Sequence, residues 1–372
     1  MTTPSHNIEF MPRCKFQTLV NILEQQGYTC IGPQLHEQTI HYDVLRRVDS
    51  LPQGLSDTQK PGFYRLEDRG HKRYFAWANG PQALKPLMFS PHESLWQSSC
   101  ETKGQITFQQ TLPEKKPLAI IGVRSCDIAA LYIHDKHFLQ HGYADPYYRA
   151  RRDGLLLIAV NCTHPAETCF CASTGDGPTA SYGYDLLLTE LDDGFIIQAH
   201  TEKGVSVRQQ LKLNEATTAQ RQAADRAMAQ SKQQQRHLPS KNLSEKLQQN
   251  LQHPRWQEIA ERCLSCGNCT SVCPTCFCHS EYEEAALDGS HSVHFRQWDS
   301  CFSQQHSYIH GLTIRPDTRL RYRQWMVHKL GSWHEQFARS GCVGCGRCIT
   351  WCPVGIDFTE EAAIICEGEA HD

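Results

Sequence analysis

The stretch Cys263-Leu-Ser-Cys266-Gly-Asn-Cys269-Thr-Ser-Val-Cys273-Pro274 recurs in pattern as Cys342-Val-Gly-Cys345-Gly-Arg-Cys348-Ile-Thr-Trp-Cys352-Pro353. Each run places its four cysteines at the same spacing and ends in proline, which is typical of bacterial ferredoxins. In such a run the first three thiolates hold one [4Fe–4S] cluster, and the fourth holds the cluster of the other run. A lone pair of closely spaced cysteines would suggest structural zinc, but two complete runs are far more specific for clusters.

The spacing therefore predicts two clusters with crossed ligand sets. Cluster 1 takes Cys263, Cys266, Cys269 and Cys352. Cluster 2 takes Cys342, Cys345, Cys348 and Cys273. Gly267, Gly344 and Gly346 let the two loops fold closely, so that backbone N–H groups can face the sulfurs.

Composition narrows the class of protein. With 372 residues, the chain is long enough for two or three domains. Its 19 cysteines do not suggest a disulfide framework, because such frameworks belong to small secreted domains. The formal net charge of -3 provides no broad basic surface for nucleic acid. No apolar run is long enough for a membrane span, and residues 1–12 lack a signal-peptide pattern, so we expect a cytoplasmic protein.

The chain divides into three parts by pattern. Residues 1–210 read as an α/β domain, with helical apolar spacing at 15–26 and strand-like patterns at 62–77, 118–123 and 155–160. The last two strands do not alternate, so we expect helices on both faces of their sheet.

Residues 211–250 read as a polar helical connector with a break at Leu238-Pro239-Ser240. Residues 251–372 form the predicted bacterial-type dicluster [4Fe–4S] ferredoxin domain. It carries an insertion at 279–341, because the two cysteine runs are far apart for a minimal ferredoxin.

The α/β domain contains a third candidate site. Cys126 follows one strand at a strand-to-helix corner, where the helix terminus would favour a thiolate. Cys162 follows the next strand, and Cys169 and Cys171 lie in the loop behind it. From spacing alone these four residues fit a cluster, a zinc ion or unligated buried thiols.

Other cysteines and histidines have weaker patterns. Cys276, Cys278 and Cys301 are three thiols, one short of a cluster, and inert or supporting roles are the default for them. The isolated cysteines are expected to be buried small apolar residues: Cys14, Cys30, Cys100 and Cys366. Four histidines are expected in the core or on the surface rather than as ligands: His134, His279, His294 and His306.

The combination of motifs resembles the beta subunit of cytosolic sulfhydrogenases, the NAD(P)-linked [NiFe] hydrogenases also called sulfur reductases, with the electron-relay subunit of anaerobic sulfite reductase as a relative. The matching text is Gly122-Val-Arg-Ser-Cys-Asp-Ile128, Asn161-Cys-Thr163, Thr168-Cys-Phe-Cys171, Cys273-Pro-Thr-Cys-Phe-Cys278, Trp298-Asp-Ser-Cys301 and the two ferredoxin runs. It spans nearly the whole chain. One departure is Ser125, where the family more often has proline.

The resemblance implies an electron-transfer subunit with no catalytic residues of its own. It favours a cluster as the occupant of the third site, at Cys126, Cys162, Cys169 and Cys171. The expected partners are a flavin subunit that handles NAD(P)H and the small and large [NiFe] hydrogenase subunits, or else sulfite reductase subunits. FAD and NAD(P) are expected on a partner, since this chain has no G-x-G-x-x-G or Walker motif after a strand.

Two other classes of function remain open. The chain could itself reduce sulfur or polysulfide through Cys276 and Cys278, which requires exposed thiols of low pKa. It could also be a redox sensor, although no DNA-reading helix or basic surface supports that role. Whether the chain is an enzyme in its own right is therefore undecided by the sequence.

Overall fold

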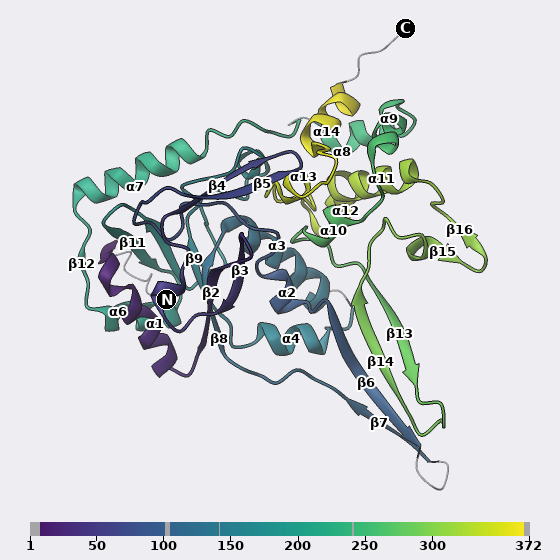
Figure 1. Cartoon of the computed structure of the whole chain (residues 1–372), viewed down its shortest axis with the longest axis horizontal. Coiled ribbons are helices and arrows are strands. Elements are labelled where there is room, and N and C mark those ends of the chain that lie inside the picture. Colours follow the sequence, from purple (N-terminus) through teal and green to yellow (C-terminus); the bar gives the residue numbers. More distant parts are fainter. Residues whose placement is uncertain (1–7, 101–104, 141, 240–241, 368–372) are drawn as a thin grey trace.

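A mixed eight-stranded sheet forms the centre of the N-terminal region (Figure 1). The computed structural model describes residues 8–100, 105–140, 142–239 and 242–367. In sheet order the strands are β12 (Asn214–Glu215), β1 (Glu9–Pro12), β11 (Gly194–Ala199), β10 (Leu186–Glu190), β9 (Leu156–Val160), β8 (Leu118–Val123), β2 (Thr29–His36) and β3 (Thr39–Val44). Strands β10, β9, β8 and β2 are parallel, and the outer strands pair antiparallel.

Helices cover both faces of this sheet, as the unbroken apolar strands predicted. One face carries α1 (Phe16–Gln25) and α6 (Glu202–Leu211), and the other carries α2 (Lys85–Met88), α3 (Ser125–Asp135) and α4 (Pro146–Arg152). Ile121 and Ile158 point into the first core, whereas Ile120 and Leu157 point into the second. The predicted α/β class of the N-terminal region is therefore confirmed.

The strand prediction for residues 62–77 is wrong over most of its length. The segment begins with a strand, but it belongs to a separate hairpin of β4 (Leu55–Lys60) and β5 (Phe63–Asp68). Beyond it, the backbone N–H groups of Tyr74 and Phe75 donate to the buried Glu190 carboxylate at 2.7 and 2.8 Å. These backbone groups are satisfied by a side chain, so they need no strand partner.

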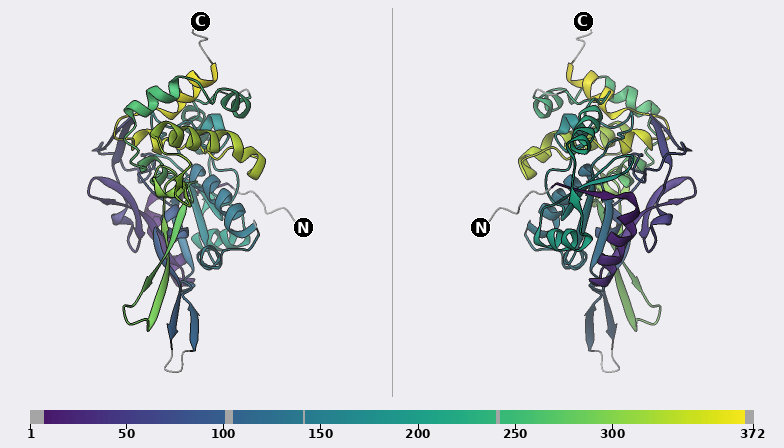
Figure 2. Two further views of the ribbon diagram at one scale, coloured as in Figure 1. Left: turned by 90° about the vertical axis from the view of Figure 1, so that its right-hand side faces the viewer. Right: turned by 90° about the vertical axis from the view of Figure 1, so that its left-hand side faces the viewer.

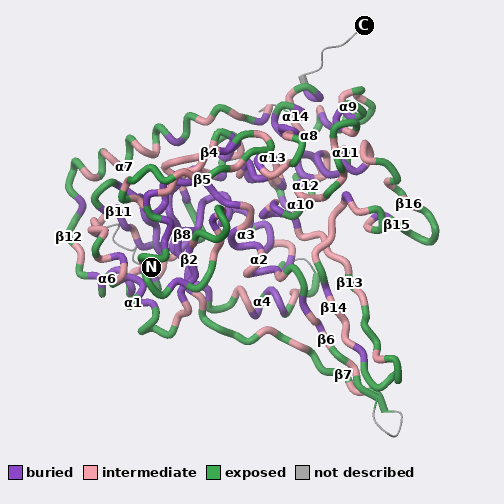
Figure 3. Tube along the Cα trace, in the orientation of Figure 1, coloured by how far each residue is buried: buried purple, intermediate pink, exposed green. Residues whose placement is uncertain are grey.

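A second sheet joins distant parts of the chain. Its order is β13 (His279–Ala285), β14 (His291–Trp298), β6 (His92–Cys100) and β7 (Ile106–Gln110), all antiparallel. Figure 1 and Figure 2 show these two hairpins leaving the body together as a narrow projection, which we call the arm. Figure 3 shows that the arm is mostly exposed or half-buried, unlike the central sheet.

The connector is partly helical and packs on the N-terminal sheet. Helix α7 (Thr218–Ser231) begins with a capping box between Thr217 and Gln220. Its Ala224 lies in a small core with Ile196 of β11. No helix is assigned over 232–239; the rest of the predicted break, at Ser240, lies outside the described residues.

Short helices build the C-terminal region around an aromatic core. They are α8 (Leu243–Gln249), α9 (Arg255–Arg262), α10 (Asn268–Ser271), α11 (Thr318–Val327), α12 (Trp333–Phe337), α13 (Arg347–Thr350) and α14 (Phe358–Glu367). Trp256, Phe302, Tyr322 and Trp325 are at the centre of that core.

Smaller elements complete the chain. They are η1 (Arg13–Lys15), η2 (Val48–Ser50), η3 (Lys136–Gln140), α5 (Cys171–Thr174), η4 (Gln305–Ser307), β15 (Tyr308–Ile309), β16 (Leu312–Thr313) and η5 (His328–Ser332). None of the helices described is both long enough and apolar enough to cross a lipid bilayer.

Candidate metal centres

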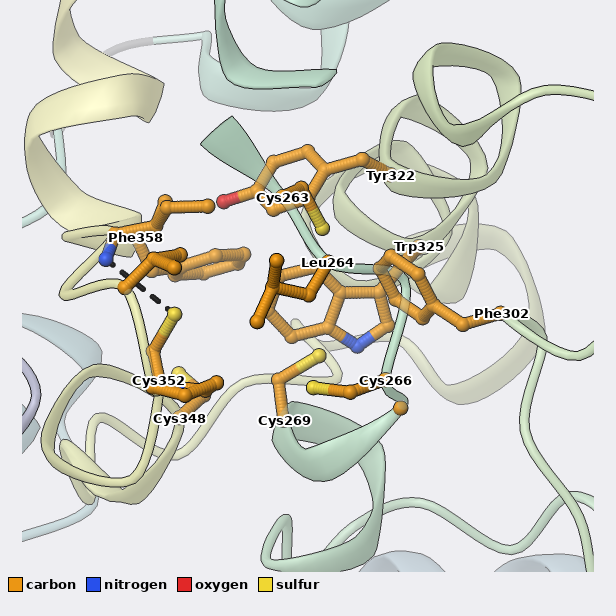
Figure 4. A pocket seen from close by; sticks show the side chains of 14 residues that line it. Cys263, Leu264, Cys266, Cys269, Phe302, Tyr322, Trp325, Cys348, Cys352 and Phe358 are labelled. Carbon is orange, nitrogen blue, oxygen red and sulfur yellow. Dashed lines mark hydrogen bonds between the residues drawn. The ribbon is translucent and has the colours of Figure 1, made fainter. Parts of the chain in front are cut away.

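The first predicted thiol set surrounds a cavity, which Figure 4 shows at close range. It is lined by Cys263, Cys266, Cys269 and Cys352, together with Cys348 of the neighbouring set. The cavity is partly open to solvent. The backbone N–H of Ile356 donates to Cys352 Sγ at 3.4 Å, which is the kind of contact that a metal-bound thiolate accepts.

Aromatic side chains form the wall of this cavity. Phe302, Tyr322 and Trp325 are each at most 3% exposed. Burial is the main cause of the raised pKa of the Cys269 thiol. The neutral thiols are favoured until a positive group binds them, so this donor set fits a cationic cluster core.

The second set lies beside the first. Burial raises the pKa of Cys348, and the ionised thiols of Cys342, Cys345 and Cys273 raise it as well, so all four members lie near one another. The backbone N–H of Gly344, whose φ is +64°, donates to Cys342 Sγ at 3.4 Å. Here the fourth cysteine of the first run meets three cysteines of the second, as the crossed pattern requires.

A buried lysine supports the second set. Lys329 is 3% exposed, and its Nζ donates to Thr275 Oγ1 at 2.8 Å. Burial would lower the pKa of Lys329, but the thiolate of Cys273 beside it raises that pKa above its usual range. Lys329 therefore keeps its positive charge and stabilises the thiolates beside it.

The third set lies at the carboxyl edge of the N-terminal sheet. Strands β8 and β9 are parallel neighbours, so the residues that follow them meet at one edge. All four thiols are at most 9% exposed: Cys126, Cys162, Cys169 and Cys171. Burial raises the pKa of Cys169, and the thiolates of Cys171 and Cys162 raise it further, as expected for converging thiols.

One electrostatic expectation for the third set is wrong. Cys126 does lie in the first turn of α3, but its pKa is raised well above the ordinary value. Burial is the main cause, and the adjacent Asp127 carboxylate adds to it. Desolvation thus outweighs the helix terminus, and a thiolate at Cys126 depends on a bound cation.

Two amides donate hydrogen bonds to sulfurs of the third set. Asn79 Nδ2 lies 3.3 Å from Cys126 Sγ, and Gln234 Nε2 lies 3.2 Å from Cys171 Sγ. Both donors come from irregular segments, one before α2 and one after α7. Sequence patterns gave no sign of either residue, because the contacts depend on tertiary structure.

The second and third sets are in direct contact. Phe170 N donates to Gly344 O at 2.8 Å, and Cys169 Sγ donates to Cys345 O at 3.7 Å. Thr168 and Thr350 share a hydrogen bond of 2.8 Å between their hydroxyls. The loop between the third-set cysteines is therefore packed against the loop of the second cysteine run.

A buried ion pair fastens this contact. Arg347 lies between two cysteines of the second run, and its Nη2 is 2.9 Å from Asp127 Oδ1, with both side chains 1% exposed. Arg347 Nε also donates to Gly80 O at 3.1 Å, and Asn79 Nδ2 donates to Asp127 Oδ2 at 3.0 Å. No sequence pattern indicates that these residues meet.

The described residues contain no group of three His, Cys, Asp or Glu side chains placed to hold a single metal ion. One zinc ion needs its sulfurs within about 2.3 Å of a common point. In each candidate set the thiols therefore lie near one another, but they are not arranged around a single metal ion.

Two of the four isolated cysteines are buried and two are exposed. Cys30 and Cys366 are buried, as expected. Cys14 and Cys100 are exposed, so the expectation of burial is wrong for them. Cys14 lies in a short 3-10 turn, and Cys100 lies at the end of an arm strand; neither place has a core to cover it.

The geometry does not favour Cys276 and Cys278 as an exposed thiol pair. Cys276 is buried, and its pKa is raised well above the ordinary value by its hydrogen bond with Cys273 and by burial. A thiol that reacts with polysulfide must be accessible and readily ionised. Cys276 meets neither condition.

Replacing Gln234 with leucine should lower the reduction potential of a cluster bound at Cys171 by on the order of tens of millivolts, because one N–H donor to sulfur is lost. The measurement is a potentiometric titration followed by EPR on the anaerobic protein. Gln233→Leu is the matched control, since Gln233 is an exposed neighbour. Equal potentials in the two variants would contradict the role given to Gln234.

Comparison with known proteins agrees with this geometry. Residues 262–356 match the 4Fe-4S dicluster domain family. Over 357 residues the chain is 28% identical to sulfhydrogenase 2 subunit beta of Pyrococcus furiosus, covering 95% of this chain and 96% of that protein. No solved structure matches the chain.

The resemblance to sulfhydrogenase beta subunits is thus confirmed, and so is the fold class, an α/β N-terminal region followed by a 4Fe-4S dicluster domain. The chain is an iron–sulfur protein of the ferredoxin type, with an electron-transfer role.

Proposed function

We propose that this chain, as a protein similar to a sulfhydrogenase beta subunit, relays electrons between a flavin subunit that handles NAD(P)H and a [NiFe] hydrogenase module. Three [4Fe–4S] clusters would be held, one by each thiol set, and each would accept and release one electron at a time. The observation that carries the proposal is the row of contacts between sets. Cys348 lines the cavity of the first set, and Cys345 touches the loop of the third.

The chain's own residues would tune this row. Buried aromatic side chains line part of the first set's cavity, and amides donate to sulfurs of the third set. Hydrogen bonds to sulfur and burial are the main controls that a protein has over cluster potential. Cys266 is exposed and Cys126 is buried, so the first set is nearer to solvent and is the better candidate to meet a partner at the surface.

Two observations support the proposed partners: the name of the relative, and the lack of a nucleotide-binding fingerprint in this sequence. The relative is by name a subunit of a sulfhydrogenase. Flavin and nicotinamide sites are assigned to a partner, because no nucleotide fingerprint is present in the sequence. The complex is proposed to be cytoplasmic. Reconstitution with hydrogenase subunits or with sulfite reductase subunits distinguishes the leading function from its alternative, since electrons should pass only within the natural complex.

Replacing both Cys162 and Cys169 with serine should remove about four iron and about four sulfide atoms per chain, because the third set loses half of its ligands. The first and second sets should keep their EPR signals. In the complex, the rate of NAD(P)H oxidation coupled to hydrogen production should fall at least tenfold if the third cluster is in the electron-transfer path. Iron, acid-labile sulfide and turnover are measured on the same anaerobic preparation.

Cys14→Ser is the control, since Cys14 is an exposed thiol outside all three sets. It should leave iron, sulfide and turnover unchanged. An unchanged iron content in the double variant would overturn the third cluster. Loss of iron without loss of turnover would keep the cluster but remove it from the path.

A further inference from the structure

Cys278 and the loop that contains Cys301 are brought together by strand register. His279, the first residue of β13, pairs with Trp298, the last residue of β14. Cys278 precedes His279 and Asp299 follows Trp298, so these two residues lie side by side at the base of the arm. Asp299 N donates to Cys278 O at 3.0 Å, which extends the ladder by one step. Two segments that the sequence separates by the whole hairpin thus meet where the arm joins the body.

The loop after Asp299 is held firmly. Asp299 Oδ1 accepts from Ser300 N at 2.7 Å and from Ser303 Oγ at 2.8 Å. Ser300 Oγ lies 2.7 Å from Thr270 Oγ1, in the first cysteine run. Cys301 is therefore anchored next to the first thiol set, and its ionised form raises the pKa of Cys269.

A histidine faces the same place. His306 Nδ1 lies 3.1 Å from Asp299 Oδ2, and a hydrogen bond with Cys278 raises the pKa of His306. A carboxylate that holds one ring nitrogen is an arrangement that orients histidine ligands of metals. His306 is 25% exposed, so it closes the outer side of the site.

Cys276 completes the group from the inner side. It is buried, its side chain is hydrogen-bonded to that of Cys273, and the Cys278 side chain lies nearby. The Cys278 side chain likewise lies near that of Cys301. Cys278 is therefore the central member, with neighbours on both sides.

The surroundings are positively charged. Lys85 is 7% exposed, and its Nζ lies 3.8 Å from the centre of the Trp298 ring, near the thiols of Cys276 and Cys278. Arg315 lies near Cys301, and its Nε is a buried donor without a hydrogen-bond partner among the described residues. Buried donors are normally satisfied, so this N–H marks a place for an acceptor such as a cluster sulfide.

We propose that Cys276, Cys278, Cys301 and His306 hold a fourth [4Fe–4S] cluster at the base of the arm. Zinc is the competing metal for three thiols and an imidazole. The cluster is favoured because two cluster sets adjoin the site through Cys269 and Cys273. This site is additional to the three clusters of the proposed relay. Its cluster would form a branch of the relay toward the arm.

The ligand test is metal content and spectroscopy on the full-length protein, prepared anaerobically. Cys278→Ser and Cys301→Ser should each lower the iron and sulfide content, by up to about four atoms of each per chain. Signals of the third set should persist in both, whereas the Cys162/Cys169 variant loses those signals and keeps the fourth. His294→Gln is the matched control, since His294 is a histidine of the arm away from the site, and should lose no iron.

The histidine is tested separately. With ¹⁵N-labelled histidine, pulsed EPR of the reduced protein should show strong coupling of one imidazole nitrogen to a cluster. His306→Cys should keep the iron, lose that coupling and shift the potential of one cluster downward, because a thiolate adds negative charge. This variant retains four ligands, so a folding defect is not an expected result.

Each other outcome overturns the proposal. Iron and sulfide unchanged in both cysteine variants would leave the three thiols unligated. One zinc per chain that disappears in those variants would make the site structural. Coupling that persists in His306→Cys would remove His306 as the ligand. Failure of the three-cluster relay is seen independently, in the Cys162/Cys169 variant.

Discussion

Replacing Arg347 with methionine is expected to lower the free energy of unfolding by about 3–5 kcal/mol, since one partner of a buried ion pair is removed and the other is left uncompensated. Asp127 is 1% exposed, and methionine cannot balance its charge. The loop of the second cysteine run should then separate from the start of α3. Anaerobic chemical denaturation of the cluster-loaded protein, with iron content followed in parallel, measures the effect.

A matched control is available in an exposed pair of equal length. Arg47 and Asp49 are also 2.9 Å apart, but their side chains are 77% and 63% exposed. Arg47→Met should have no measurable effect, because water already solvates both charges. The double variant Arg347→Met with Asp127→Leu should be less destabilised than Arg347→Met alone. If Arg347→Met were no worse than Arg47→Met, the pair would have no structural role.

Gly344→Ala is expected to destabilise the protein by about 2–5 kcal/mol, of which about 1–2 kcal/mol is the left-handed backbone and the rest is steric overlap. The φ of Gly344 is +64°, and an added Cβ would lie 2.5 Å from the backbone N and Cα of Cys171. Since backbone atoms cannot move aside as a side chain can, the second and third thiol sets must separate. The measurements are unfolding free energy and the rate of electron transfer between clusters.

Gly27→Ala separates the two causes. Gly27 has a φ of +86°, but no atom lies within 4 Å of the position where its Cβ would be. The Gly27→Ala variant should lose about 1–2 kcal/mol of unfolding free energy, from the left-handed backbone alone, and its electron transfer should be normal. Equal destabilisation by both alanine variants would mean that close approach of the two loops is unimportant.

The features that sequence predicted are those with a local cause. The two cysteine runs predict a dicluster domain, because the spacing of the ligands follows from the shape of the cluster. The unbroken strands at 118–123 and 155–160 correspond to β8 and β9, since strands covered on both faces are apolar throughout. The corner that begins α3 is likewise visible in the sequence.

Features with a distant cause were not predictable. Tyr74 and Phe75 have strand-forming side chains, but the carboxylate of Glu190 in β10 accepts hydrogen bonds from their backbone N–H groups. Gln234 contacts Cys171 across 63 positions, and Arg347 contacts Asp127 across 220. In the sequence, polar residues of irregular segments resemble ordinary surface residues, because their contacts form only in the folded chain. His306 was assigned no role for the same reason.

The pairing of β6 with β14 also constrains the order of events during synthesis. Ser98 and Ser292, which share a hydrogen bond across this pairing, are 194 positions apart. At roughly 5–20 residues per second on a ribosome, the β6–β7 hairpin would wait about 10–40 s for its partner strand. During that interval one edge of β6 is unpaired. An unpaired strand edge is a place where another chain can pair, so β14 also protects this edge once it has been made.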